Sequence, residues 1–108
     1  MLHPLTQLNI DIDGNSPSSF IELSEQDQVI LCQWILGNLK PISRMNKRHT
    51  SYGLKHKYEH DKANGGRYIT NGMFKGGMLL CGFEPDNEHD LNWCFKISEK
   101  SPAFRRDV

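Results

Sequence analysis

The spacing of apolar residues along the chain predicts three helices followed by one strand. Apolar side chains recur every three or four positions in 24–38, 52–60 and 72–81, and each segment begins at or just after a Ser, Thr or Asn that can cap a helix. Residues 91–97 instead alternate between apolar and polar side chains, the pattern of a strand with one buried face. We therefore predict an α+β fold with three short helices and a small antiparallel sheet, compatible with a winged-helix arrangement.

The large side chains on the inward faces of these elements should form the core. We expect it to be built around Trp34, Tyr58, Phe74, Met78, Trp93 and Phe95. Strand 91–97 needs a partner, and the two candidates are 67–69 and the alternating segment 8–12. Gly76 and Gly77 lie inside the third predicted helix, where each Gly costs about 1 kcal/mol relative to Ala. We expect another stretch of backbone to pack closely there.

The length of 108 residues fits one domain with a modest core. Residues 1–23 are expected to form an extended lead-in, and 24–108 a single α+β domain. No apolar run approaches the roughly 20 residues that cross a bilayer, and the N-terminus lacks the pattern of a signal peptide. The three cysteines, an odd number without close pairing, favour free thiols in a reducing compartment. These features predict a cytoplasmic protein with no membrane contact, and they leave its oligomeric state open.

Charge is distributed very unevenly along a chain whose net charge is zero. The first 39 residues contain no Lys or Arg, whereas residues 40–57 contain six and no Asp or Glu. Within this basic run, 42–50 is poor in apolar residues and is expected to form a loop or a short helix. A local excess of positive charge attracts phosphate or an acidic partner, whatever the overall balance.

A winged-helix arrangement would turn this charge into a nucleic-acid interface. In that interpretation the basic run lies along phosphates, and the helix 72–81 enters the major groove with its first turns at the base edges. The predicted contact residues are Arg44, Lys47, Arg48, Lys55, Lys57, Asn71 and Lys75. The segment 84–90, at the tip of the expected wing, carries four acids that nucleic acid would repel. The alternative is therefore a protein-binding modulator, such as an inhibitor of a nucleic-acid enzyme whose acids mimic phosphate.

Metal and catalytic sites find less support in the sequence. His56 and His60 have the i,i+4 spacing that places two imidazoles on one helix face, and Cys81, His89 and Cys94 are further possible ligands. The chain has no Cys-x-x-Cys and no His-Glu-x-x-His motif. Cys81 and Cys94 lie within apolar patterns, where a free cysteine is usually a buried hydrophobe rather than a nucleophile. We predict no metal, no cofactor and no enzymatic activity.

Four stretches of the chain carry a resemblance to known proteins. They are Ser51–His56, Tyr68–Lys75, Cys81–Pro85, and Asn92–Trp93 together with Ser101–Phe104. Through them, residues 50–105 resemble small proteins of phages and integrative elements of Gram-positive bacteria, and the layout of 68–97 is similar to winged-helix segments appended to phage primases and helicases. The resemblance implies a mobile-element context and transfers no site residues. Together with the charge pattern, it predicts a non-enzymatic accessory protein that binds nucleic acid.

Overall fold

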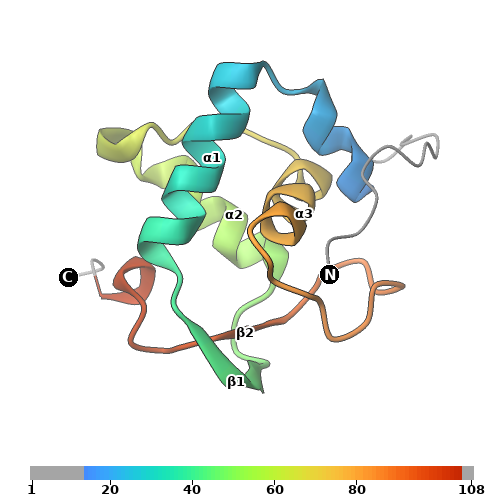
Figure 1. The fold of residues 1–108 in the computed structure, drawn as a ribbon, viewed down its shortest axis with the longest axis vertical. Helices are drawn as coiled ribbons and strands as arrows, with labels where there is room; N and C mark the ends of the chain where they lie inside the picture. Colours follow the sequence, from blue (N-terminus) through green and yellow to red (C-terminus); the bar gives the residue numbers. More distant parts are fainter. Residues whose placement is uncertain (1–13, 106–108) are drawn as a thin grey trace.

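The computed structural model describes residues 14–105 as three α-helices, a two-stranded antiparallel sheet and three short 3-10 helices (Figure 1). In chain order the elements are η1 (Pro17–Glu22), α1 (Glu25–Asn38), β1 (Pro41–Asn46), α2 (Ser51–His60), η2 (Lys62–Asn64), α3 (Asn71–Leu80), β2 (Phe95–Ile97) and η3 (Pro102–Phe104). The predicted α+β fold is confirmed. Within the described part of the chain, no helix combines the length and the apolar character required to cross a membrane.

Each α-helix begins directly after a capping residue, where the sequence suggests Ser24 for the first helix, Thr50 or Ser51 for the second and Thr70 or Asn71 for the third. The hydroxyl of Ser24 accepts from the backbone N–H of Asp27 at 3.1 Å and opens α1. Thr50 and Thr70 cap α2 and α3 in the same way. Side-chain caps satisfy backbone N–H groups that have no partner within the helix, which is why the helix starts can be located from the sequence.

Helix α3 is the centre of the molecule. Eight of its ten residues are buried, and α1, α2 and η1 all pack against it. Gly76 lets η1 approach closely, because a Cβ there would lie 2.4 Å from the carbonyl oxygen of Pro17. Gly77 faces α1 instead, where a Cβ would lie 2.9 Å from a side-chain carbon of Leu31. Residues 17–22 were predicted to be extended, but they form a 3-10 helix that places Phe20 in the core.

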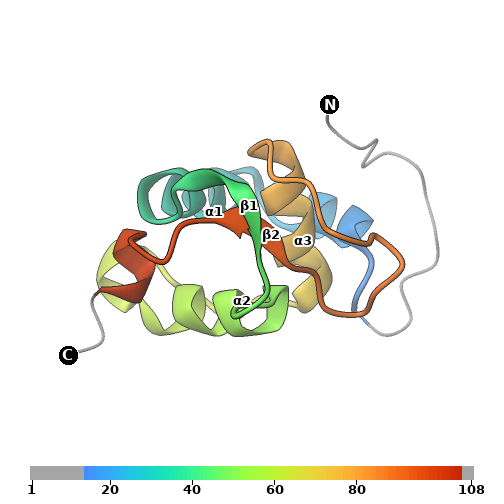
Figure 2. The same ribbon diagram turned by 90° about the horizontal axis from the view of Figure 1, so that it is seen from below.

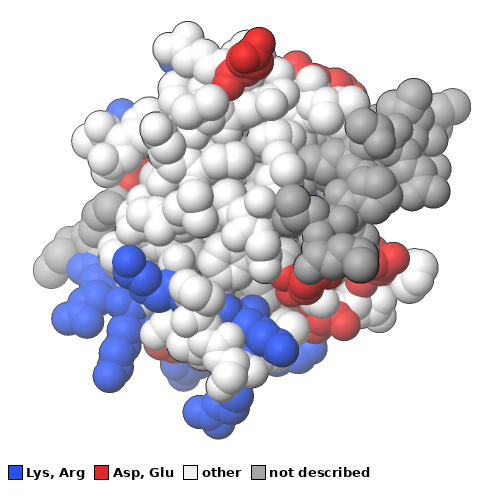
Figure 3. Space-filling model, viewed as in Figure 1, with Lys and Arg blue, Asp and Glu red and all other residues white. Residues whose placement is uncertain are grey.

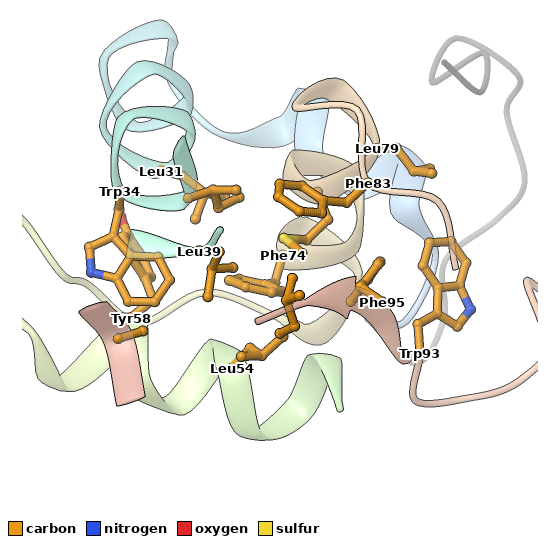
Figure 4. Close-up of a cluster of buried hydrophobic side chains, with 14 of the residues drawn as sticks. Leu31, Trp34, Leu39, Leu54, Tyr58, Phe74, Leu79, Phe83, Trp93 and Phe95 are labelled. Atoms are coloured by element: carbon orange, nitrogen blue, oxygen red, sulfur yellow. The ribbon is translucent and has the colours of Figure 1, made fainter. Parts of the chain in front are cut away.

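The six predicted core residues are all buried (Figure 4). The Trp34 ring meets the rings of Tyr58 and Phe74 edge to face, with centroids 5.5 and 6.5 Å apart. On the other side of α3, Trp93 meets Phe95 in the same manner at 6.2 Å. Such edge-to-face pairs add to the stability that the burial of these large rings already provides.

The sheet differs from the prediction in both its partner and its extent. Strand β2 covers only Phe95–Ile97, and it pairs with β1, in the segment predicted to be a loop or a short helix. Residues 67–69 form no strand, and 8–12 lies outside the described residues. Trp93 is buried as expected, but Leu91 is 62% exposed because the chain before residue 95 is irregular. Most of β1 is exposed, so it carries no alternating pattern by which the sequence could reveal it.

Candidate nucleic-acid interface

Positively charged side chains gather at the end of the molecule formed by β1, β2 and η3 (Figure 3). Figure 2, seen from this end, shows the two strands crossing between α1 and α2, with η3 beside them. We define the basic surface as Lys40, Arg44, Lys47, Arg48, Lys57, Lys96, Lys100 and Arg105. Four of the predicted contact residues, Arg44, Lys47, Arg48 and Lys57, belong to it.

The irregular pairing of the two strands pushes β1 outward. Pro41 pairs with Ile97 and Asn46 with Phe95, so four residues of β1 lie opposite the single residue Lys96. Arg44 is in this bulged stretch, and Lys96 is the exposed residue between two buried ones in β2. The ribbon therefore presents cations from both strands to solvent.

Asn46 holds the turn that follows β1. Its amide donates to the carbonyl oxygen of Ile97 at 3.0 Å and to the carboxylate of Glu99 at 2.7 Å. Its side-chain oxygen accepts from the backbone N–H of Arg48 at 2.9 Å. Asn46 is itself buried, so Lys47 and Arg48 are displayed on a turn of fixed geometry. The sequence gives no signal for this role, since it depends on the pairing of β1 with β2.

Contacts with the C-terminal part of the chain bring further cations to the same end. The backbone N–H of Lys40 donates to the hydroxyl of Ser101 at 2.9 Å, which places Lys100 beside the start of β1. The rings of His49 and Phe104 stack with centroids 3.8 Å apart, and Lys57 Nζ lies 5.7 Å from the centroid of Phe104. Sequence reasoning missed Lys96, Lys100 and Arg105, because they lie far from the basic run in the sequence and reach it only through tertiary contacts such as the strand pairing and the Lys40–Ser101 hydrogen bond.

The cations of the basic surface differ in whether they form ion pairs. Lys47 forms an ion pair with Asp86. Burial raises the pKa of Asp86, but hydrogen bonds from Lys47 and from the backbone of Cys94 have the larger combined effect, so the pKa of Asp86 is lowered. Among the residues that the structure describes, Arg44, Arg48 and Lys96 form no ion pair. These three side chains are available to an anionic ligand.

Lys55, although part of the basic run, is not on this surface. It is only 5% exposed, and its Nζ lies 3.1 Å from the carboxylate of Glu59, one turn further along α2. The same carboxylate oxygen accepts from the backbone N–H of Ile69 at 3.1 Å. The prediction that Lys55 lies along phosphates is therefore wrong, because its charge is paired inside the protein.

Asn71 and Lys75 are also buried, so they do not reach the base edges of a duplex as predicted. Lys75 is 3% exposed, donates to the backbone oxygen of Asn15 at 3.1 Å and lies 4.8 Å from the centroid of the Trp93 ring. The Asn71 amide is used within the protein as well. The physical reason is the central position of α3, which is covered on several sides and has no face free to enter a groove.

The acidic segment 84–90 is next to the basic surface rather than at the tip of a hairpin wing. Glu84, Glu88 and Asp90 are exposed, and Asp86 joins the segment to the β1 turn through its ion pair with Lys47. In Figure 3 acidic side chains gather at the lower right, across from the blue group at the lower left. The molecule thus presents two charged surfaces of opposite sign side by side.

The histidines and cysteines are dispersed in the part of the chain that the structure describes, where no three His, Cys, Asp or Glu side chains gather to hold a metal ion. The rings of His56 and His60 lie 6.2 Å apart, and His56 faces the carboxylate of Glu59. Burial raises the pKa of Cys94, which favours its neutral thiol. A hydrogen bond with Cys81 lowers the pKa of Cys32 to about 7. This contact joins α1 to the end of α3, and the sequence does not reveal it.

Comparisons with protein-family models, curated proteins and solved structures gave no match to this chain. The resemblance to proteins of phages and integrative elements therefore stays a prediction. The assignment of a function rests on the geometry and charge of the molecule itself.

Proposed function

We propose that this protein is a cytoplasmic, non-enzymatic accessory protein of a phage or mobile element that binds nucleic acid through the basic surface. The observation that carries the proposal is the convergence of cations from three separate parts of the sequence, 40–48, 57 and 96–105, all of them exposed except the half-buried Lys57. A chain of zero net charge has no compositional reason to concentrate positive charge at one end. Such a patch is the usual electrostatic footprint of phosphate binding.

The form of the surface also suits a nucleic-acid backbone. A two-stranded ribbon is narrow enough to enter a major groove or to lie along a strand, and most protein–nucleic acid hydrogen bonds go to phosphates and sugars. Arg44 and Lys96 point from the two strands of the ribbon, and Arg48 from the turn that Asn46 fixes. Cations on a fixed framework lose little conformational freedom when they bind.

The experiment is a fluorescence-anisotropy titration of labelled single strands and duplexes between about 50 and 200 mM salt. Each phosphate contact releases condensed counterions, so removing two contacts in an Arg44→Ala, Arg48→Ala variant should weaken binding and flatten the log–log salt slope by about two. Stability should change by no more than about 0.5 kcal/mol, since the side chains are exposed. If the wild-type protein binds no nucleic acid at about 50 mM salt, the proposal fails.

A matched control removes the same charge elsewhere. Lys62 and Arg67 are exposed cations at the end of α2 opposite the β1 turn, about 15 Å away along a helix of ten residues. The Lys62→Ala, Arg67→Ala variant has the same net charge as the surface variant. If both variants lose affinity equally, overall charge rather than the basic surface governs binding.

A protein-binding modulator is the second candidate, favoured by the exposed acids beside the basic surface. Replacing Glu84 by Gln and Asp90 by Asn separates the two functions. If nucleic acid is the ligand, the variant should bind it more tightly, because two repelling charges are gone. A partner that reads the acids as a phosphate mimic would instead be lost from a pull-down with this variant.

A further inference from the structure

A hollow of about 350 Å³ lies between the first turns of α2 and α3 and the loops at 14–15 and 91–92. Two tyrosines, one lysine and three asparagines give it its chemical character: Tyr52, Tyr68, Lys55, Asn15, Asn71 and Asn92. We call it the tyrosine pocket. Among these residues, only Lys55 and Asn71 are expected from the sequence to contact a ligand, Lys55 at a phosphate and Asn71 at a base edge in the major groove.

The two tyrosine rings are exposed but tied to one buried cation. Tyr52 is 53% and Tyr68 77% exposed, and Lys55 Nζ lies 5.3 Å from the centroid of each ring. Lys55 is anchored in turn by Glu59, so its cation–π contacts restrain two aromatic faces at the rim of the pocket. Exposed aromatic faces of this kind are stacking platforms for flat ligands, including nucleobases.

One buried acceptor in the polar lining has no donor among the described residues. Asn71 Nδ2 lies 3.1 Å from each of three oxygens, on the side chains of Asn15 and Asn92 and on the backbone of Leu91. Asn71 Oδ1 is buried and accepts from no residue that the structure describes. Buried acceptors rarely stay unpaired, so the pocket suits a ligand that brings N–H donors.

We propose that the tyrosine pocket binds an unstacked nucleobase, whose ring stacks on Tyr52 or Tyr68 and one of whose N–H groups donates to Asn71 Oδ1. All four bases carry an N–H donor and a flat face, so this recognition tolerates different sequences. A cationic ligand is disfavoured because Lys55 already faces both rings. A carboxylate is a poorer match because it supplies no donor to Asn71 Oδ1.

This inference deepens the proposed function and rests on it, since it identifies the preferred ligand as single-stranded nucleic acid. The turn with Lys47 and Arg48 leads directly into the first turn of α2, which carries Tyr52. A strand that crosses the basic surface at this turn can therefore place a base in the tyrosine pocket. Bases of a duplex are stacked and paired, and they are not available to such a site.

The test uses a single strand of about 12 nucleotides with one central 5-iododeoxyuridine, whose base can be photocross-linked to an aromatic side chain. Mass spectrometry should locate the cross-link at Tyr52 or Tyr68. Tyr68→Ala and Tyr52→Ala should each weaken single-strand binding about tenfold and leave duplex binding unchanged. Tyr68→Phe, which keeps the aromatic face, should bind like the wild type. Leu36→Ala, at an exposed apolar position of α1, is the matched control.

The outcomes separate this inference from the proposed function. If the wild type binds single strands and duplexes equally and the tyrosine variants bind normally, the inference is overturned while the basic surface stands. Cross-links confined to residues other than Tyr52 and Tyr68 would also overturn the inference and leave the basic surface as the binding site. If no oligonucleotide binds, the proposed function fails, and thymidine monophosphate added alone decides whether the pocket takes a free nucleotide. Loss of folding in Tyr52→Ala would leave Tyr68→Ala to carry the test.

Discussion

The molecule contains two sets of cations that look alike in the sequence and differ in their surroundings. Lys55 and Lys75 are buried, and each is held by polar and aromatic partners inside the protein. Arg44, Arg48 and Lys96 are exposed on the β1–β2 ribbon and its turn, without an ion pair among the described residues. The charges of the first set are used within the protein, and only those of the second set are free of ion pairs and exposed to an anionic ligand. A run of positive charge in a sequence therefore does not by itself define a binding surface.

The cost of burying charge explains why the two sets diverge. A lysine taken out of water must regain the lost hydration through hydrogen bonds and opposite charge. Lys55 has Glu59 and two tyrosine rings, and Lys75 has the Asn15 carbonyl and the Trp93 ring. The exposed cations keep their hydration and lose part of it only when they bind.

The largest expected effect is the loss of the ring that covers Lys75. Trp93→Ala should lower the free energy of unfolding by about 3–5 kcal/mol, because it opens a cavity in the core and removes the cation–π contact. Chemical denaturation measures this. Leu91→Ala, two residues away but exposed, is the control and should have little effect. A Trp93→Ala protein that melts within a few degrees of the wild type would contradict the described core.

Removing the partner of Lys55 should be nearly as damaging. Glu59→Ala leaves a buried ammonium without its carboxylate and the Ile69 N–H without its acceptor, so we expect a loss of about 3 kcal/mol. A Lys55→Met, Glu59→Leu double variant should recover much of the loss, because no charge is then left unpaired. If Glu59→Ala changes unfolding no more than Arg48→Ala does, then Lys55 is solvated and the two sets of cations are not distinct.

The contact between η1 and α3, the helix that carries Lys75, can be tested at Gly76 of α3. A methyl group on Gly76 would lie 2.4 Å from the Pro17 carbonyl oxygen and from the Phe20 Cβ, so Gly76→Ala should destabilise the fold by about 1–3 kcal/mol. Gly37→Ala is the matched control: the site has open space around it in α1, and Ala should stabilise that helix by up to about 1 kcal/mol. Thermal unfolding of both variants should shift in opposite directions.

The smallest expected effect is the change in stability at low pH when Glu99, an exposed residue beside the β1 turn, is replaced. A hydrogen bond from Asn46, with His49 nearby, lowers the pKa of Glu99 below its ordinary value of 4.5. A lowered carboxyl pKa stabilises the fold above the ordinary value, and this stability is lost as the pH falls through the folded pKa. Glu99→Gln should therefore show a flatter loss of stability below about pH 4.5 than the wild type. Parallel pH profiles for the two proteins would show that Glu99 does not support the β1 turn.

The elements that could be predicted from the sequence are those with local signals. Ser24, Thr50 and Thr70 mark the helix starts by side-chain capping, and the helical spacing of large apolar residues identified the core. Strand β1 could not be predicted, because exposure along most of its length removes the alternation that identifies a strand. Its pairing with a strand about fifty residues later is set by tertiary packing, for which a single sequence holds no direct signal.

The candidate site was predictable only in part for the same reason. Arg44, Lys47, Arg48 and Lys57 were found because they are close together in the chain, whereas Lys96 and Lys100 reach the surface through β2. Burial of Lys55 did have a signal, since Glu59 lies one turn away and Leu54 and Tyr58 flank it on the apolar face. Burial of Lys75 follows from the central place of α3, which is known only once the fold is known.

The most direct test of the two sets of cations is lysine acetylation of the folded protein, with and without saturating single-stranded nucleic acid, followed by mass spectrometry. In the free protein, Lys40, Lys47, Lys96 and Lys100 should react readily, and Lys55 and Lys75 should stay unmodified. Nucleic acid should protect the first four and leave Lys62, outside the basic surface, as reactive as before. Acetylation of Lys55 or Lys75 at the rate of the exposed lysines, or no protection of the first four, would contradict the account.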